Sequence, residues 1–247
     1  MEKNYNGLAY FIEKKEKIGY TLFMGYHIDT GLIKDKFKED TECPLCEIRK
    51  VAEKQFLHEF LNDAVMADDC RIEVRKKGFC AEHFGKLFAG QNKLSVALQT
   101  ETRAEAVSDL FSPVKSAGQA KKRAKEIENS LSHCVICDLL EESMIKYYKT
   151  VAQLFAREKE FFKTLHSSRG FCFHHYAELL KYSASAGFMT KEYLKVLSDV
   201  QSRNFKRLSD ELKAFCVKHD YRNANEPLGN AETALPRAGE KFYGKKD

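Results

Sequence analysis

The sequence predicts an all-α protein: two related helical-hairpin units, each closed by a Cys3His metal site, and a long C-terminal amphipathic helix. Three observations predict this class. The 247 residues include only 4 Pro and 13 Gly, which is too little turn punctuation for a protein made of many short strands. Apolar residues recur every three or four positions over long stretches, which is the helical period. A cysteine and histidine motif occurs twice, which indicates an internal duplication.

Each copy of the motif consists of Cys-x2-Cys, a long spacer, and then Gly-Phe-Cys-x2-His. The first copy has CPLC and GFCAEH, and the second has CVIC and GFCFHH. The two copies lie 91 to 92 residues apart, and inside each copy 33 or 34 residues separate the Cys-x2-Cys pair from the Cys-x2-His pair. This agreement in spacing, order and flanking residues favours a duplicated metal site over independent buried or redox cysteines.

Three thiolates and one imidazole form the ligand set of a closed, tetrahedral zinc site. We therefore predict two zinc ions per chain, with an iron–sulfur cluster as the minor alternative. The spacing leaves open whether each Cys-x2-Cys pair shares its metal with the Cys-x2-His pair of its own copy or of the other copy. The predicted ligands are Cys43, Cys46, Cys80, His83, Cys134, Cys137, Cys172 and His175.

The motif positions divide the chain into five segments. Residues 1–40 form an N-terminal arm, whose apolar end is expected to pack on the core or to form a short strand. Residues 41–111 are the first repeat, and residues 131–220 are the second repeat with the long C-terminal helix. A linker over 112–130, either irregular throughout or helical in its second half, joins the repeats, and a turn-rich tail covers 221–247. Within each repeat, a metal is expected to hold the starts of two helices together and so close a hairpin.

The N-terminal residues carry mixed charges and lack the apolar core of a signal peptide. No apolar run reaches the length of a membrane span. We therefore expect a cytoplasmic protein without membrane contact, in which thiols stay reduced. Under those conditions we expect the eight cysteines to be ligands, core thiols or redox groups rather than disulfide partners.

Several residues next to the motif have competing interpretations. Cys70 and Cys216 lie outside the two quartets, and we expect both to be core thiols. Asp68 and Asp69 are expected to cap a helix or loop, with a second cation or acid–base site as the alternative. His174 adjoins His175, but the match of His175 to the first copy favours His175 as the ligand.

The net charge of +5 comes from one segment, because Lys115 to Lys125 holds five basic residues and no acid. A nucleic-acid contact through Lys121, Lys122, Arg123 and Lys125 is therefore an alternative function. The segment has no aromatic residue on which a base would stack, so a solvated linker is the simpler interpretation.

Four stretches together carry a resemblance: ECPLCEIRK, RIEVRKKGFC, RGFC and YRNANEPLGNAETALPRA. They resemble an uncharacterised bacterial family, a domain of unknown function found mostly in Firmicutes, over about residues 26–240. The resemblance implies a bacterial, cytosolic, duplicated Cys/His protein. It implies no activity, substrate or catalytic residue.

The sequence contains no G-x-S-x-G, P-loop, Rossmann or H-E-x-x-H motif. A zinc ion with four protein ligands also lacks the open position that activates water. We therefore expect a non-enzymatic interaction or regulatory module with an unknown protein partner. The alternatives are a nucleic-acid-binding protein, a thiol or metal redox sensor, and an enzyme with a pocket near Asp68 and Asp69.

Overall fold

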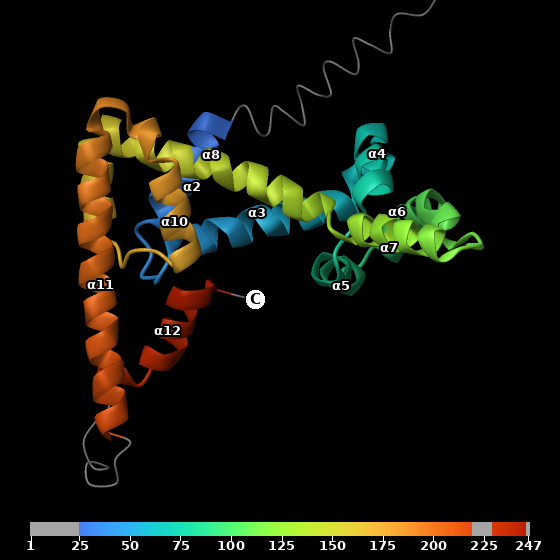
Figure 1. Cartoon of the computed structure of the whole chain (residues 1–247). Coiled ribbons are helices and arrows are strands. Elements are labelled where there is room, and N and C mark those ends of the chain that lie inside the picture. The colour runs from blue at the N-terminus through green and yellow to red at the C-terminus, as the bar shows by residue number, and fades with distance from the viewer. Residues whose placement is uncertain (1–24, 219–228, 246–247) are drawn as a thin grey trace, which may run out of the picture. The chain divides into compact units, whose positions relative to one another are not determined.

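The computed structural model describes residues 25–218 and 229–245, and every regular element assigned over these residues is helical (Figure 1). The all-α prediction is therefore confirmed. The α-helices are α2 (Gly25–Lys36), α3 (Pro44–Leu61), α4 (Asp68–Lys77), α5 (Ala81–Ala89), α6 (Lys93–Val107), α7 (Ala117–Leu131), α8 (Val135–Arg157), α9 (Lys159–Ser167), α10 (Phe173–Lys181), α11 (Thr190–Lys218) and α12 (Ala234–Tyr243). Short 3-10 helices are η1 (Asp63–Met66), η2 (Ser108–Phe111), η3 (Ser183–Met189) and η5 (Gly229–Ala231).

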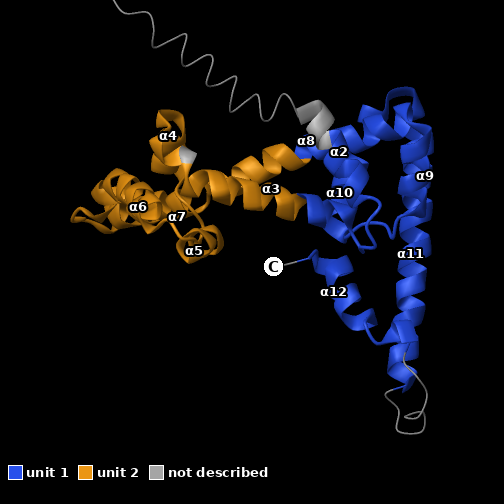
Figure 2. Ribbon diagram, turned by 180° about the vertical axis from the view of Figure 1, so that it is seen from behind, with its two compact units in different colours: residues 1–48, 145–247 blue, residues 49–144 orange. Residues whose placement is uncertain are grey.

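The chain folds into two compact units that do not follow the order of the two motif copies (Figure 2). Unit 1 contains Met1–Ile48 and Ile145–Asp247, and unit 2 contains Arg49–Met144. The chain passes from unit 1 to unit 2 within α3 and returns to unit 1 within α8. Each unit therefore takes one helix start from one copy and the remaining helices from the other copy.

The core of unit 2 is formed by apolar side chains from α3, α4, α5, α6 and α8. Phe60 packs edge-to-face against Phe79, with ring centroids 5.6 Å apart. The cap of α6 stabilises this unit because Asn92 Oδ1 accepts a hydrogen bond of 3.1 Å from Ser95 N. The buried core residues are Ala52, Phe56, Phe60, Ala64, Val74, Leu87, Val96, Cys134, Val135, Ile136 and Leu140.

The core of unit 1 lies along α11, the long C-terminal helix that the sequence predicts. Its buried side chains include Tyr193, Leu197, Val200 and Leu208, which recur at the three- and four-residue spacing of one helix face. Tyr193 packs on Phe155, with ring centroids 5.0 Å apart. This face gives α11 a buried side along most of its length.

Three segments contain more helix than their predicted structure requires. The described part of the N-terminal arm forms α2 and packs on the core through the buried Ile33, which is the first of its two expected roles, and it forms no strand. Residues 1–24 of the arm lie outside the described ranges. The 112–130 segment is mostly helical, because α7 begins after Ser116, whose Oγ accepts a hydrogen bond of 3.2 Å from Gln119 N. The 221–247 segment contains α12. Among the described helices, none is long and apolar enough to cross a membrane.

Candidate metal centres

The structure gathers the eight predicted ligands into two groups of four. Site 1 in unit 1 consists of Cys43, Cys46, Cys172 and His175, and site 2 in unit 2 consists of Cys80, His83, Cys134 and Cys137. Each site thus combines the Cys-x2-Cys pair of one copy with the Cys-x2-His pair of the other copy. This crossed grouping differs from the hairpin closure within one copy, and it settles the alternative that the spacing leaves open.

In site 1 the three sulfurs surround one imidazole nitrogen. The Sγ atoms of Cys43, Cys46 and Cys172 lie 3.3, 3.4 and 3.2 Å from His175 Nδ1. The Sγ atoms of Cys46 and Cys172 are 3.7 Å apart. All four residues are buried, so the site is closed to solvent on every side.

Site 2 has nearly the same internal geometry. The Sγ atoms of Cys80, Cys134 and Cys137 lie 3.2, 3.4 and 3.3 Å from His83 Nδ1. The Sγ atoms of Cys80 and Cys137 are 3.9 Å apart. Cys80 and Cys137 are half-buried, so site 2 is less enclosed than site 1.

The donor atoms of both sites fit a tetrahedral zinc ion. Zn–S bonds of about 2.3 Å in a tetrahedron place two sulfurs about 3.8 Å apart. The observed separations of 3.7 and 3.9 Å agree with this value. A disulfide would instead require sulfurs about 2.05 Å apart, and the eight cysteines are free thiols. With Nδ1 turned toward the sulfurs, a histidine that binds a metal through Nδ1 would carry its proton on Nε2.

In the absence of a cation, the clustered thiols of site 1 favour one thiolate and oppose the ionisation of the others. Burial, followed by the adjacent Cys172 and Cys46, raises the pKa of the Cys43 thiol well above its ordinary value. Hydrogen bonds from Cys43 and Cys46 lower the pKa of Cys172 to about 3. In site 2, burial and its two partner thiols raise the pKa of Cys137. A divalent cation removes this opposition because it stabilises every thiolate at once.

A glycine with positive φ precedes each Cys-x2-His pair. The φ angles of Gly78 and Gly170 are 67° and 80°, a region that residues with a side chain rarely occupy. A Cβ atom at Gly78 would lie 2.9 Å from Arg103 Nε, and one at Gly170 would lie 2.9 Å from Gln201 Oε1. Both the conformation and the close neighbours therefore explain the glycine of the Gly-Phe-Cys motif.

The Cys-x2-His spacing follows from the helix start after each glycine. Cys80 and Cys172 are extended N-cap residues of α5 and α10, and each histidine occupies the third helical position. Side chains on a helix lean toward its N-terminus, so the imidazole returns over the N-cap sulfur. A spacing of two residues between the cysteine and the histidine therefore brings the sulfur and the imidazole nitrogen to the same metal position.

The Nε2 atoms of the two histidines have different surroundings. In site 2, His83 Nε2 is 3.0 Å from Glu53 Oε1, and Lys86 Nζ donates a 2.8 Å hydrogen bond to the same oxygen. Such a carboxylate fixes the tautomer and orientation of a metal-bound imidazole. In site 1, His175 Nε2 is buried and has no hydrogen-bond partner among the described residues. The residue of the second copy that corresponds to Glu53 is Met144.

A buried lysine from α12 lies beside site 1. Lys241 is 0% exposed, and its Nζ donates hydrogen bonds of 2.7 Å to Glu42 O and 2.6 Å to Arg169 O. It also lies 3.1 Å from the Glu42 carboxylate. Burial lowers the pKa of Lys241, although Glu42 and Cys43 favour its charged form. A zinc ion with three thiolates would carry a net charge of −1, which the ammonium group of Lys241 would offset.

The last turn of α12 also brings the backbone to the sulfurs. A Cβ atom at Gly244 would lie 3.8 Å from Cys46 Sγ and 3.9 Å from Cys172 Sγ. The α12 segment therefore covers site 1. Sequence reasoning misses this role because Pro and Gly within ALPRAGEKFY favour a turn-rich interpretation, although Pro236 stands in the first helical turn, where it is tolerated.

The remaining predicted residues lie away from the two sites. Cys70 packs against the core of unit 2, as expected. Cys216 is exposed, so its prediction as a core thiol is wrong. Asp68 and Asp69 form the first turn of α4, where negative charge stabilises the helix dipole. His174 is exposed and His175 is buried.

The basic cluster lies on α7, a helix on which no described residue is buried. Lys121, Lys122 and Lys125 are exposed. Arg123 is engaged within the chain, because Nη1 donates a 2.6 Å hydrogen bond to Asp109 O and Nε lies 3.2 Å from Glu126. Three of the four predicted nucleic-acid residues are thus accessible.

The comparison with known proteins identifies a family but no activity. The chain belongs to DUF6062, a family of unknown function whose model matches residues 24–247. It is also similar to an uncharacterised 23.9 kDa protein in the xynA 3′ region of Caldicellulosiruptor sp. (strain Rt8B.4). The two sequences are 28% identical over 192 residues, which cover 76% of this chain and 87% of the relative. No solved structure matches the chain.

Proposed function

We propose that this DUF6062 protein binds two structural zinc ions and serves as a non-enzymatic interaction or regulatory module. The observation that carries the proposal is the closure of both sites. Each has three thiols and an imidazole within 4.8 Å of one another, which fills the four positions of a tetrahedral ion. No position is left for a substrate or an activated water.

Metal analysis of the purified full chain tests the zinc assignment. We expect about two zinc ions per chain by elemental mass spectrometry, and about one after Cys172→Ser or Cys137→Ser. If the sites hold iron–sulfur clusters instead, the purified chain should contain iron and sulfide in place of zinc and should absorb visible light. A chain that folds without metal and binds none from solution would overturn the proposal.

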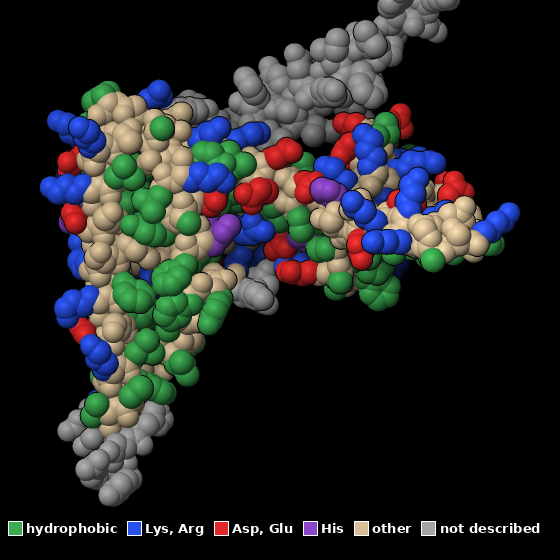
Figure 3. Space-filling model, in the orientation of Figure 1, with side chains coloured by type: hydrophobic (Ala, Val, Ile, Leu, Met, Phe, Trp, Pro, Cys, Tyr) green, Lys and Arg blue, Asp and Glu red, His purple; other side chains and the backbone are tan. Residues whose placement is uncertain are grey.

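An exposed aromatic cluster on unit 1 supports the interaction role. Figure 3 shows hydrophobic side chains gathered on the face over α11 and α12. Phe173, Phe205 and Phe242 are 46%, 40% and 37% exposed, and their ring centroids lie 5.1 to 6.1 Å apart. Exposed aromatic groups of this kind are enriched at protein interfaces. We propose that the cluster contacts an apolar surface of a protein partner.

Site-specific photo-crosslinking tests this contact. A photoreactive phenylalanine at Phe205 should give one defined adduct in cells, and Phe242→Ser should remove that adduct without changing zinc content. The same probe at Phe111, which is 74% exposed on unit 2, is the matched control. Equal labelling from both positions would contradict a specific contact.

The accessible thiols of site 2 support a redox sensor as a second candidate. Cys80 and Cys137 are half-buried and their sulfurs are 3.9 Å apart. In this proposal hydrogen peroxide takes two electrons from the two thiolates, which join as a disulfide while peroxide and two protons become water. Mild peroxide should then release about one zinc per chain, and reductant with zinc should restore it. Equal release from both sites, or no release, would argue against this candidate.

A further inference from the structure

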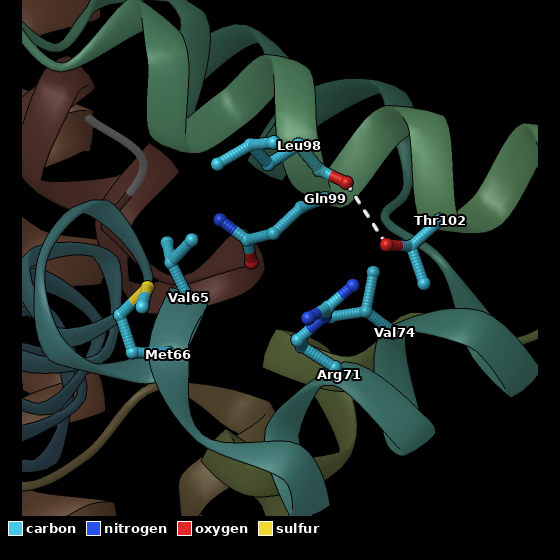
Figure 4. A pocket seen from close by; sticks show the side chains of 7 residues that line it. All are labelled: Val65, Met66, Arg71, Val74, Leu98, Gln99 and Thr102. Atoms are coloured by element: carbon cyan, nitrogen blue, oxygen red, sulfur yellow. Dashed lines mark hydrogen bonds between the residues drawn. The ribbon is translucent and has the colours of Figure 1, made fainter.

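A small cavity in unit 2 lies between η1, α4 and α6, apart from both metal sites (Figure 4). Its volume is about 60 Å³, several times the roughly 10–15 Å³ that one water molecule requires. It opens to solvent beside Met66, which is 80% exposed. The cavity is lined by Val65, Met66, Arg71, Val74, Leu98, Gln99 and Thr102.

The floor of the cavity holds a buried hydrogen-bond acceptor without a partner. Gln99 is 2% exposed, and its Oε1 makes no hydrogen bond within the described part of the chain. Its Nε2 donates hydrogen bonds of 2.7 Å to Phe60 O and 3.1 Å to Ser95 O. Because both of these partners accept only, the amide cannot be reversed. Figure 4 shows this oxygen turned toward the space between Val65 and Arg71, where a donor group of a bound ligand would satisfy it.

The side chains on the walls and at the rim of the cavity limit the kind of ligand that can carry this donor group. Val65 and Val74 are buried, and with Leu98 they offer an apolar surface to the body of a ligand. Thr102 Oγ1 already donates a 2.9 Å hydrogen bond to Leu98 O. Figure 4 shows the Arg71 side chain directed from α4 toward the cavity, where its guanidinium suits a carboxylate.

We propose that this cavity is a binding site for a small aliphatic α-hydroxy or α-amino carboxylic acid. The hydroxyl or ammonium group donates to Gln99 Oε1, the carboxylate pairs with Arg71, and the aliphatic part packs on Val65, Val74 and Leu98. The site is independent of the zinc ions and of the partner surface in the proposed function.

Calorimetry and ligand-observed NMR with four compounds on the zinc-loaded full chain test the site. We expect saturable binding of 2-hydroxyisovalerate or L-valine at millimolar concentrations or below. Isovalerate lacks the donor and valinamide lacks the carboxylate, so each should bind about tenfold more weakly. No saturable binding by any of these compounds, or equal binding by isovalerate, would overturn the proposal.

Three substitutions test whether binding depends on this cavity rather than on general surface charge. Arg71→Gln should weaken binding of the best acid about tenfold, whereas Arg75→Gln on the same exposed side of α4 should leave it unchanged. Val65→Leu should fill the cavity and abolish binding. Zinc content and circular dichroism should remain those of the parent in all three variants. An affinity that Arg71→Gln does not change would contradict the assignment.

Discussion

The two metal centres have the same ligands but different surroundings. Site 2 has a carboxylate on its imidazole and two half-buried thiols. Site 1 is fully buried, has a buried lysine beside it, and leaves His175 Nε2 without a partner among the described residues. The motif determines the four metal ligands of each site, while residues outside the motif determine how the negative charge of the three thiolates is stabilised.

This difference leads us to expect that site 1 is the more inert site and site 2 the more reactive one. In site 1 a bound ion would be enclosed by α12 and by the buried pair of Lys241 and Glu42, so exchange would require that part of unit 1 to open. In site 2 the half-buried thiols allow approach from solvent, and Glu53 instead strengthens the imidazole as a ligand. We therefore expect site 1 to exchange metal slowly and site 2 to exchange it faster.

The largest effect should come from losing one ligand, and it should follow the crossed grouping. Cys43→Ser removes a thiolate from site 1, and structural zinc contributes on the order of 10 kcal/mol. The amides of α10 in unit 1 should then exchange hydrogen much faster, while those of α5 in unit 2 stay protected. Hydrogen exchange with mass spectrometry measures both helices in one experiment.

The reciprocal variant completes this test. Cys134→Ser should expose the amides of α5 and leave those of α10 protected. If Cys43→Ser instead exposed α5, each metal would be held within one copy, and the crossed assignment would be wrong.

The next effect concerns the buried cation of site 1. Lys241→Met removes the charge beside the thiolates and leaves the carbonyl oxygens of Glu42 and Arg169 without their donor, so we expect a loss of about 3 kcal/mol in the free energy of unfolding. Lys245→Met is the matched control. It removes only a partly exposed ion pair with Glu47, which is worth about 1 kcal/mol or less. Chemical denaturation of the zinc-loaded chains measures the difference.

The Lys241 variant also has a specific readout. Site 1 should lose zinc to a chelator more readily, and site 2 should not. Equal denaturation midpoints for Lys241→Met and Lys245→Met would show that the buried lysine does not offset the charge of site 1.

A smaller effect is expected from the carboxylate of site 2. Glu53→Gln keeps the size of the side chain but removes the charge that faces His83 Nε2. The loss of such a partner typically weakens metal binding about 10- to 100-fold. Chelator competition should show this change for one zinc ion and none for the other. An unchanged affinity at both sites would indicate that Glu53 serves only its ion pair with Lys86.

The sequence indicates the metal ligands more readily than their grouping. Cys-x2-Cys and Cys-x2-His are local patterns with a local cause, the start of a helix. Which Cys-x2-Cys pair joins which Cys-x2-His pair depends on where α3 and α8 lead the chain. A grouping within one copy and a grouping between copies both give three cysteines and one histidine per site. Glu53 is one of several charged residues in α3, so only its contact distinguishes it. Lys241 lies in a segment whose Pro and Gly suggest a tail, and its burial follows from tertiary packing.

The smallest effect should be shared by the two sites, because the glycine before each cysteine has the same backbone requirement. Gly78→Ala and Gly170→Ala force a side chain into a positive-φ conformation and against Arg103 or Gln201, which should each cost about 1–3 kcal/mol. Gly85→Ala is the control, since a Cβ there meets no described atom within 4 Å and helical alanine gains about 0.5–1 kcal/mol over glycine. Thermal unfolding of the zinc-loaded chains measures all three.

Losses of similar size at Gly78 and Gly170 would show that the turn into each site is a common structural requirement. A neutral result at either glycine would show that the turn at that site tolerates a side chain.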